Sequence, residues 1–235
     1  MPDCVACPKF DKKRQVCLFA EKWNPQCVIR NCVGAFAEEV ISQASGKKLL
    51  EVGHGVWKGP RILCKEHGVE WNGVDPRWKT NAKARLNRGT ATLIPFPDNT
   101  FDVVCGFETM EHWREHNDEP VAGLREIHRV LKRGGVVAIS VPIHLHGSDE
   151  FVEGDVPKIL SYFEPGLWSE IVKDEWRRRH EPLPAYKGWL ENRLRRHYEL
   201  LVQKGFGKQE IQKEPSSWSL SITARKKSTT ATLKT

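Results

Sequence analysis

The chain has 235 residues, of which 29% are charged, and a formal net charge of +7 at pH 7. This length suits one α/β domain with a small appendage, and no apolar run approaches the ~20 residues of a membrane-spanning helix. The opening Met-Pro-Asp-Cys does not have the pattern of a signal peptide, so we expect a cytoplasmic protein without a membrane partner.

The excess positive charge belongs to the two ends of the chain. Residues 1–32 hold six Lys/Arg against three Asp/Glu, and residues 225–235 hold four Lys/Arg and no acid. Residues 33–224 are therefore neutral overall, and we expect 225–235 to form a disordered basic tail. A local excess remains in residues 173–208, with ten Lys/Arg and five Asp/Glu. A solvated helix face explains this excess at least as well as a phosphate-binding surface does.

Five of the seven cysteines fall within the first 32 residues. They have the spacing C-x2-C-x9-C-x9-C-x4-C and are Cys4, Cys7, Cys17, Cys27 and Cys32. A Cys-x2-Cys pair joins two thiolates to one metal through a tight turn, and two later cysteines complete a tetrahedron. We therefore predict a metal-binding module over residues 1–32, with four of the five cysteines as ligands. All-thiolate ligands suit zinc or an iron–sulfur cluster, and a scatter of reduced thiols is the alternative.

Short apolar strands alternate with amphipathic helices in the middle of the chain. We predict helices over Cys32–Ser45, Pro60–His67 and Pro120–Leu131, and a short helix or turn over Asn81–Asn87. The predicted strands are Leu49–Val52, Glu70–Val74, Ala91–Ile94, Asp102–Gly106 and Val136–Val141, the last of which Pro142 stops. Strands that alternate with helices in this way indicate an α/β domain.

The pattern after residue 142 is looser. Residues 143–186 contain four prolines, Trp168 and Trp176, and we interpret them as a substrate cap or lid inserted into the main domain. Residues 188–204 have the spacing of an amphipathic helix. Residues 207–212 and 218–224 alternate like an antiparallel pair of strands.

A glycine turn follows the first predicted strand. Gly53 and Gly55 allow a sharp turn and the close approach of a ligand. Glu51, at the end of the strand, stands where the dinucleotide fingerprint has its first glycine, and an acid there suits a cationic ligand better than a pyrophosphate. The second predicted strand ends in Asp75, where a doubly wound sheet binds ribose hydroxyls. An ordinary strand–helix turn is the alternative interpretation.

Two further motifs follow in the same order, IPFPDNTFDVV (residues 94–104) and LREIHRVLKRGG (residues 124–135). Together with the glycine turn and Asp75, they resemble the class I S-adenosylmethionine-dependent methyltransferases, in particular the type 11 and ubiquinone-biosynthesis O-methyltransferases. The resemblance covers about residues 47–142. It implies a methyltransferase domain over residues 33–224 with a seven-stranded, mostly parallel, doubly wound sheet of the Rossmann-like type.

The resemblance also implies a set of cofactor contacts at the carboxyl ends of the strands. Gly53 and Gly55 would contact the methionine part of S-adenosylmethionine, Asp75 the ribose, and the loop at Thr90 the adenine. Many relatives have an acid at the position of Thr90, and a threonine hydroxyl could still accept a hydrogen bond there. The full predicted set is Glu51, Gly53, Gly55, Asp75, Thr90, Ala91 and Phe107.

The residues Glu108-Thr109-Met110-Glu111-His112 place two carboxylates and an imidazole at i, i+3 and i+4, which is one face of a helix. They resemble the Glu-x-x-Glu-His of ubiquinone-biosynthesis O-methyltransferases and small-RNA 2′-O-methyltransferases, which implies a divalent ion beside the acceptor hydroxyl. His144 or His146 would then be a fourth ligand. Two alternatives are that Glu111 or His112 acts as a base that orients the acceptor, which we favour, and that the three residues only form the pocket wall. The predicted catalytic residues are His112, Glu111 and His144.

The acceptor is less well defined than the cofactor. The cap resembles methyltransferases found with surface-polysaccharide synthesis genes, and nine tryptophans suit sugar rings, so we predict O-methylation of a small molecule or a glycan. An RNA or DNA methyltransferase that uses the cysteine module and basic tail is the first alternative, but no Asn/Asp-Pro-Pro-Tyr/Phe motif follows the fourth strand and the core is neutral. A non-catalytic binding module is the second, and the intact glycine turn and Asp75 count against it.

Overall fold

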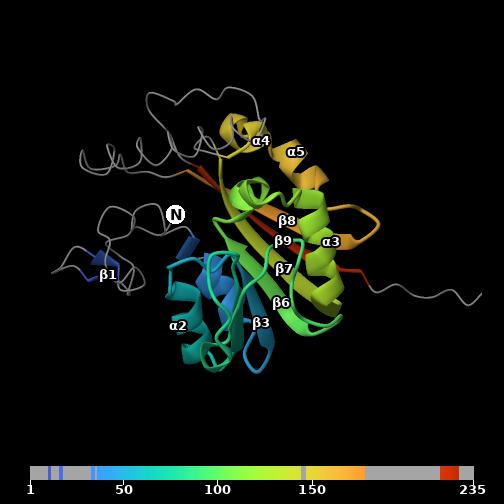
Figure 1. Ribbon diagram of the computed structural model, residues 1–235. Helices are drawn as coiled ribbons and strands as arrows, with labels where there is room; N and C mark the ends of the chain where they lie inside the picture. The colour runs from blue at the N-terminus through green and yellow to red at the C-terminus, as the bar shows by residue number, and fades with distance from the viewer. Residues whose placement is uncertain are drawn as a thin grey trace, which may run out of the picture.

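The computed structural model describes Phe10–Asp11, Val16–Cys17, residues 33–34, residues 36–143, residues 147–177 and residues 218–227. The main sheet has seven strands in the order β5-β4-β3-β6-β7-β9-β8 (Figure 1). A separate antiparallel pair joins β1 (Phe10–Asp11) to β2 (Val16–Cys17). No helix within the described ranges is long and apolar enough to cross a membrane.

Five strands of the main sheet run parallel: β3 (Lys48–Val52), β4 (Glu70–Val74), β5 (Leu86–Asn87), β6 (Phe101–Phe107) and β7 (Leu131–Ile143). The sixth and seventh, β9 (Trp218–Lys226) and β8 (Trp168–Arg177), continue the sheet antiparallel. The strand order reverses between β3 and β6, so the point where a ligand binds in such a sheet lies beyond their carboxyl ends. The predicted doubly wound, seven-stranded sheet is confirmed.

Helices cover both faces of the sheet, which is why β3 is buried at all four positions after Lys48. Residues 36–42 are helical and share one apolar cluster with Leu63 and Cys64 of α2 (Gly59–Glu66). The other cluster joins the opposite face of the sheet to three helices, α3 (Pro120–Val130), α4 (Asp149–Glu153) and α5 (Val156–Ser161). Both helices and strands thus bury apolar faces that the sequence pattern predicts.

The strand predicted over Ala91–Ile94 is wrong. The third strand of the parallel set is instead the two-residue β5, which follows the short helix η2 (Ala82–Ala84). Side chains take the hydrogen bonds that a sheet neighbour would otherwise make: the Ala91 N–H donates to Asp118 and the Ile94 N–H donates to Glu126, each at 3.0 Å. The loop therefore has its backbone donors satisfied without joining the sheet.

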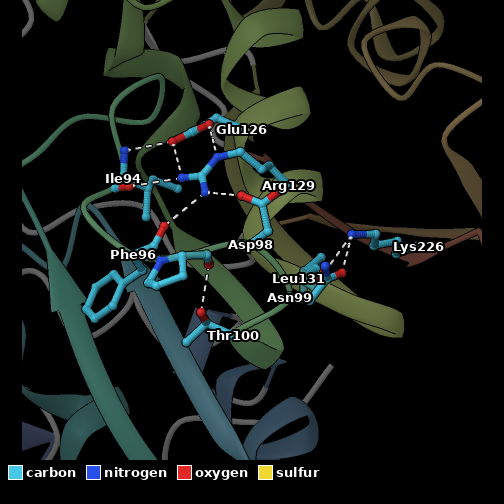
Figure 2. A network of polar contacts seen from close by, with 10 residues as sticks. Ile94, Phe96, Asp98, Asn99, Thr100, Glu126, Arg129, Leu131 and Lys226 are labelled. Atoms are coloured by element: carbon cyan, nitrogen blue, oxygen red, sulfur yellow. Dashed lines mark hydrogen bonds and ion pairs between the residues drawn. The ribbon is translucent and has the colours of Figure 1, made fainter.

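Arg129 of α3 fixes the loop that leads from this segment into β6 (Figure 2). Its Nε and Nη2 each donate to the Glu126 carboxylate at 2.8 Å, and its Nη1 donates to Asp98 at 2.6 Å. The remaining donors reach two carbonyls, those of Phe96 at 2.9 Å and Ile94 at 3.1 Å. All five N–H groups of the guanidinium are thus engaged, which ties the PFPDN loop to the helix.

Pro142 does not end its strand as predicted, because β7 continues to Ile143. The Ser140 carbonyl accepts from the Glu108 N–H at 2.9 Å, on the side of β6. Pro142 is two residues further on, so its missing N–H faces the same side, where β6 has already ended. Pairing with β9 continues through Pro142 and Ser219.

The two strands that close the sheet differ from the predicted pair. Residues 218–224 do form a strand, within β9, but its described neighbour on the outer side is β8, from the segment interpreted as a cap. Trp168 begins β8 and is 2% exposed in the main core. Of the described residues in the predicted cap, 147–167 lie outside the sheet. The predicted strand 207–212, the predicted helix 188–204 and the basic tail beyond residue 227 lie outside the described residues.

Candidate functional site

The glycine turn connects β3 to α2 as predicted. Gly53 and Gly55 have φ angles of 73° and 53°, which glycine adopts without strain. A Cβ on Gly53 would lie 2.8 Å from the Thr109 Cβ, so only glycine allows the turn to pass this close to Thr109, two residues after β6. The turn therefore lies at the reversal point of the sheet.

Asp75, at the end of β4, reaches across to this turn. Its side chain is buried, and its Oδ2 accepts from the Gly55 N–H at 3.0 Å. Its Oδ1 accepts from the Arg77 N–H at 2.8 Å, and the Arg77 side chain also donates to both oxygens. Burial disfavours the charged carboxyl, but the Arg77 and Gly55 contacts outweigh burial and hold the pKa of Asp75 below its usual value. An ionised carboxylate at this place suits the hydroxyl groups of a ribose.

Glu51 is deeply buried beside the turn. Its Oε2 accepts from the Trp71 indole N–H at 2.8 Å. Burial raises the pKa of Glu51 to about 8, the Trp71 hydrogen bond opposes this, and the charge of Asp75 adds to it. The carboxyl is therefore largely protonated at neutral pH, in contrast to the fixed negative charge that the sequence suggests.

Sequence analysis did not identify a role for His54, which occupies the middle of the glycine turn. Its Nδ1 lies 3.0 Å from the Gly55 carbonyl, and its ring packs near Trp71 and Trp78 with centroids 5.9 and 5.6 Å away. Burial is the main cause that lowers the pKa of His54, and the nearby Asp75 charge partly offsets it. The ring therefore packs between the glycine turn and the two tryptophans and supports the turn.

The loop at Thr90 is held by a residue that sequence analysis missed. Asp118, which precedes α3, is 3% exposed. Its Oδ1 accepts from the Thr90 hydroxyl at 3.0 Å and from the Thr92 hydroxyl, and its Oδ2 accepts from the Ala91 N–H at 3.0 Å. The only signal in the sequence is an acid just before a helix that begins with proline, which does not reveal a partner 28 residues away.

Phe107, predicted to contact the cofactor, is the last residue of β6 and is 5% exposed. Its ring makes edge-to-face contacts with Phe36 and Trp57, at centroid distances of 6.0 and 5.9 Å. It therefore packs the helical segment 36–42 and the turn against the end of the sheet.

Glu108, Glu111 and His112 do not share a helix face, so this prediction is wrong. Glu108 lies before the short helix η3 (Met110–His116), with a φ of 55°, and its Oε1 is 3.4 Å from the Ser219 hydroxyl of β9. Glu111 and His112 remain neighbours, with His112 Nε2 3.6 Å from Glu111 Oε1. Because η3 is a 3₁₀ helix that starts after Glu108, the expected i, i+4 geometry does not arise.

His112 pairs instead with Glu115, which sequence analysis did not single out. The His112 Nδ1 makes a short contact with Glu115 Oε1. A carboxylate on one ring nitrogen orients an imidazole, and the other nitrogen, Nε2, lies near the buried Glu111 carboxylate. The His112 side chain is 26% exposed, so a ligand at the carboxyl end of β6 can reach it.

Most of the predicted metal ligands lie outside the part of the chain that the structure describes. Among the described residues, no group of three or more His, Cys, Asp or Glu side chains could hold a metal ion. The predicted ligands His144 and His146 lie outside the described residues, as do Cys4, Cys7, Cys27 and Cys32, while Cys17 lies in β2. The divalent-ion prediction at Glu108, Glu111 and His112 has no geometric support.

Comparison with known proteins assigns the central part of the chain. Residues 50–139 match the family model of the methyltransferase domain, Methyltransf_11. This segment includes the glycine turn, Asp75 and the Thr90 loop. This match supports a methyltransferase domain of the class I S-adenosylmethionine-dependent type in this part of the chain.

Two relatives of the methyltransferase domain illustrate the similarity. The chain is 26% identical to 2-methyl-6-phytyl-1,4-hydroquinone methyltransferase of Synechocystis over 63% of its own length and 45% of that protein. It is 27% identical to erythromycin 3″-O-methyltransferase of Saccharopolyspora erythraea over 66% of its own length and 55% of that protein. The chain thus spans about half the length of these curated relatives.

Solved structures show the same fold at low sequence identity. YcgJ from Bacillus subtilis is 18% identical, with a TM-score of 0.57 over 83% of this chain and 99% of that one. The [4+2]-cyclase SpnF is also 18% identical, with a TM-score of 0.56 over 81% of this chain and 80% of that one. These likenesses establish the architecture of the domain. They do not identify the reaction, which has to be inferred from the residues of the site.

A buried ion pair attaches the α4–α5 segment to the methyltransferase site. Arg114 of η3 donates to Glu150 of α4 at 2.5 Å, and the Tyr162 hydroxyl donates to the same oxygen at 2.6 Å. A Cβ on Gly147, just before α4, would lie 3.1 Å from the Glu111 Cβ. Residues 147–162 therefore cover Glu111 next to the exposed edge of His112, and Figure 1 shows α4 and α5 together at one end of the molecule.

Proposed function

We propose that this protein transfers the methyl group of S-adenosylmethionine to a small-molecule acceptor. The observation that carries the proposal is the contact between Asp75 and the Gly55 N–H, which sets an ionised carboxylate on the glycine turn at the reversal point of the sheet. The names of the relatives, which include hydroquinone, cycloartenol and erythromycin methyltransferases, support an acceptor of this class.

The residues at the turn fit the cofactor. Gly55 leaves open space, since a Cβ there would have only the Arg77 guanidinium, at 3.3 Å, and a carbonyl, at 3.9 Å, nearby. Asp75 has lone pairs for two ribose hydroxyls once the exposed Arg77 side chain moves aside. When bound, S-adenosylmethionine supplies an electrophilic methyl group. The protein then has to hold an acceptor atom in line with it, and this orientation supplies most of the rate.

We further propose that His112 is the base that removes the acceptor proton, and that Glu115 positions it. Glu115 contacts Nδ1, so in this proposal Nε2 takes the proton from the acceptor hydroxyl. The neighbouring Glu111 carboxylate lies 3.6 Å from Nε2 and stabilises the imidazolium that results. His144 remains a proposed catalytic residue on the basis of the sequence.

An acceptor oxygen, on a sugar or another hydroxylated compound, is the form of this proposal that we favour. The name of the erythromycin 3″-O-methyltransferase supports oxygen as the acceptor atom. The cysteine spacing still supports our proposal of zinc or an iron–sulfur cluster in residues 1–32. Elemental analysis of protein purified without oxygen tests the metal, and its absence would remove that part of the proposal.

The decisive test uses calorimetry followed by a transfer assay. The wild-type protein should bind S-adenosylmethionine and S-adenosylhomocysteine with micromolar affinity, a typical order of magnitude for an enzyme ligand. Radiolabelled methyl transfer is then measured on pools of hydroxylated small molecules, oligosaccharides and total RNA. Label in the first two pools supports the proposal, label in RNA alone replaces the acceptor class, and a failure to bind either ligand overturns it.

A further inference from the structure

The Thr90 loop lies directly beside the proposed ribose site. A Cβ on Gly89 would lie 2.8 Å from the Val74 Cγ2, so Gly89 packs against the residue that precedes Asp75. The Asp75 N–H also donates to the Asn87 carbonyl at 3.1 Å. A base attached to a ribose at Asp75 would therefore lie close to the loop that carries Thr90.

The polar side-chain groups that this loop can present to a base are threonine hydroxyls, not a carboxylate. Thr90 and Thr92 are both partly exposed, and their oxygens are 3.3 Å apart. A free hydroxyl can donate or accept and would not distinguish an amino group from a carbonyl. Discrimination therefore requires that something fix the direction of the hydroxyl protons.

The buried Asp118 can fix the direction of both hydroxyl protons. Its carboxylate is acceptor-only and faces both hydroxyls, so the proton of each threonine is drawn inward, either to Asp118 directly or through the other threonine. In either arrangement the outward lone pair of Thr90 Oγ1 has no proton of its own. The Ala91 N–H, also bound to Asp118, is likewise turned inward.

We propose that Asp118 makes Thr90 an obligate hydrogen-bond acceptor and thereby selects a cofactor with a 6-amino group on its purine. This inference rests on the proposed function. It assigns Asp118 a positioning role: the residue does not touch the base but decides which chemical group the loop accepts. A 6-carbonyl purine would present an acceptor to an acceptor.

Calorimetry with S-adenosylhomocysteine and its 6-carbonyl analogue, S-inosylhomocysteine, tests the proposal. The wild-type protein should bind the adenosyl compound at least about tenfold more tightly, because a site built for one hydrogen-bond polarity rejects the other. In Asp118→Asn, the amide can keep the Ala91 contact while its NH2 faces the threonines. The hydroxyl protons then turn outward, and the preference should vanish or reverse.

Two matched variants complete the design. Thr90→Val removes the acceptor and should abolish the preference while Asp118 stays intact. Asp102→Asn makes the same chemical change at the opposite end of the sheet, where Asp102 binds Lys48 and Lys132, and should keep the wild-type ratio. Equal binding of both ligands by the wild type, or a wild-type ratio in Asp118→Asn or Thr90→Val, would overturn the inference. No binding of either ligand by the wild type would instead refute the proposed function on which it rests.

Discussion

The guanidinium of Arg77 lies across the carboxylate of Asp75, with Nε 3.3 Å from Oδ1 and Nη2 3.3 Å from Oδ2. Asp75 is almost fully buried, whereas 64% of the Arg77 side chain is exposed. The arginine therefore occupies the lone pairs that a ribose would use, and it does so from the solvent side. Its exposed side chain can leave without unfolding the turn.

This contact predicts opposite effects for the two residues. Asp75→Asn should weaken S-adenosylhomocysteine binding by about 1–3 kcal/mol, as expected for lost hydrogen bonds to a charged group. Arg77→Ala should leave affinity unchanged or raise it a few-fold, because the ribose no longer competes with the guanidinium. Calorimetry measures both. A loss in Arg77→Ala as large as that in Asp75→Asn would show that Arg77 itself contacts the cofactor.

The pairing of His112 with Glu115 predicts a base whose activity depends on pH. His112→Ala should lower turnover by about 10²–10⁴, the range for a positioned general base, and Glu115→Gln should lower it less. Wild-type turnover should fall at low pH as the imidazole protonates and can no longer accept a proton.

Chelators and a neighbouring histidine provide the controls for this prediction. Activity should survive EDTA, and His116→Ala, an exposed histidine on the same short helix, should keep wild-type turnover. If His112→Ala changed only the Michaelis constant for the acceptor, the residue would be a pocket wall rather than a base. A strict divalent-metal requirement would also contradict our assignment.

The raised pKa of Glu51, about 8 in the folded protein against a usual 4.5, predicts a stability change with pH. Between these values the folded state holds a proton that the unfolded state has lost, so the free energy of unfolding falls as pH rises. Glu51→Gln removes this linkage and keeps an oxygen for Trp71. The variant should gain stability relative to wild type from pH 5 to pH 8, by at most about 1.4 kcal/mol per pH unit.

Urea denaturation at pH 5 and pH 8 measures this difference. Glu153→Gln, at an exposed position of α4, is the control and should show no change in relative stability with pH. A constant difference between Glu51→Gln and wild type at the two pH values would mean that Glu51 is ionised in the folded protein at neutral pH.

The hydrogen bonds of Arg129 predict that even a charge-conserving substitution lowers the free energy of unfolding. Arg129→Lys keeps the charge but cannot reach Glu126, Asp98 and two carbonyls at once, because lysine has one nitrogen. We expect a loss of about 2–3 kcal/mol, the scale of one or two hydrogen bonds to charged groups. Arg125 is exposed and pairs with Glu164, so Arg125→Lys should cost much less. Equal losses in chemical denaturation would contradict the role of the network in Figure 2.

The sequence by itself determined the elements whose signals are local. The β3 and β4 strands, the α2 and α3 helices, the glycine turn and Asp75 follow from apolar periodicity and from the backbone freedom of Gly53 and Gly55, which act over a few residues. For that reason the fold class could be predicted, and Asp75 lies on the glycine turn as expected. The parallel order of the strands followed from the same alternation.

Only the tertiary structure decided which distant side chains meet. Asp118 reaches Thr90 from 28 residues away, which removes Ala91–Ile94 from the sheet. β8 replaces the predicted hairpin partner because it pairs with β9, some fifty residues later in the chain. His112 binds Glu115 instead of joining Glu108, since the 3₁₀ helix begins at Met110, two residues after Glu108. Pairings of this kind depend on which elements pack against each other in the folded protein. The periodicity of apolar residues along the chain does not specify these contacts.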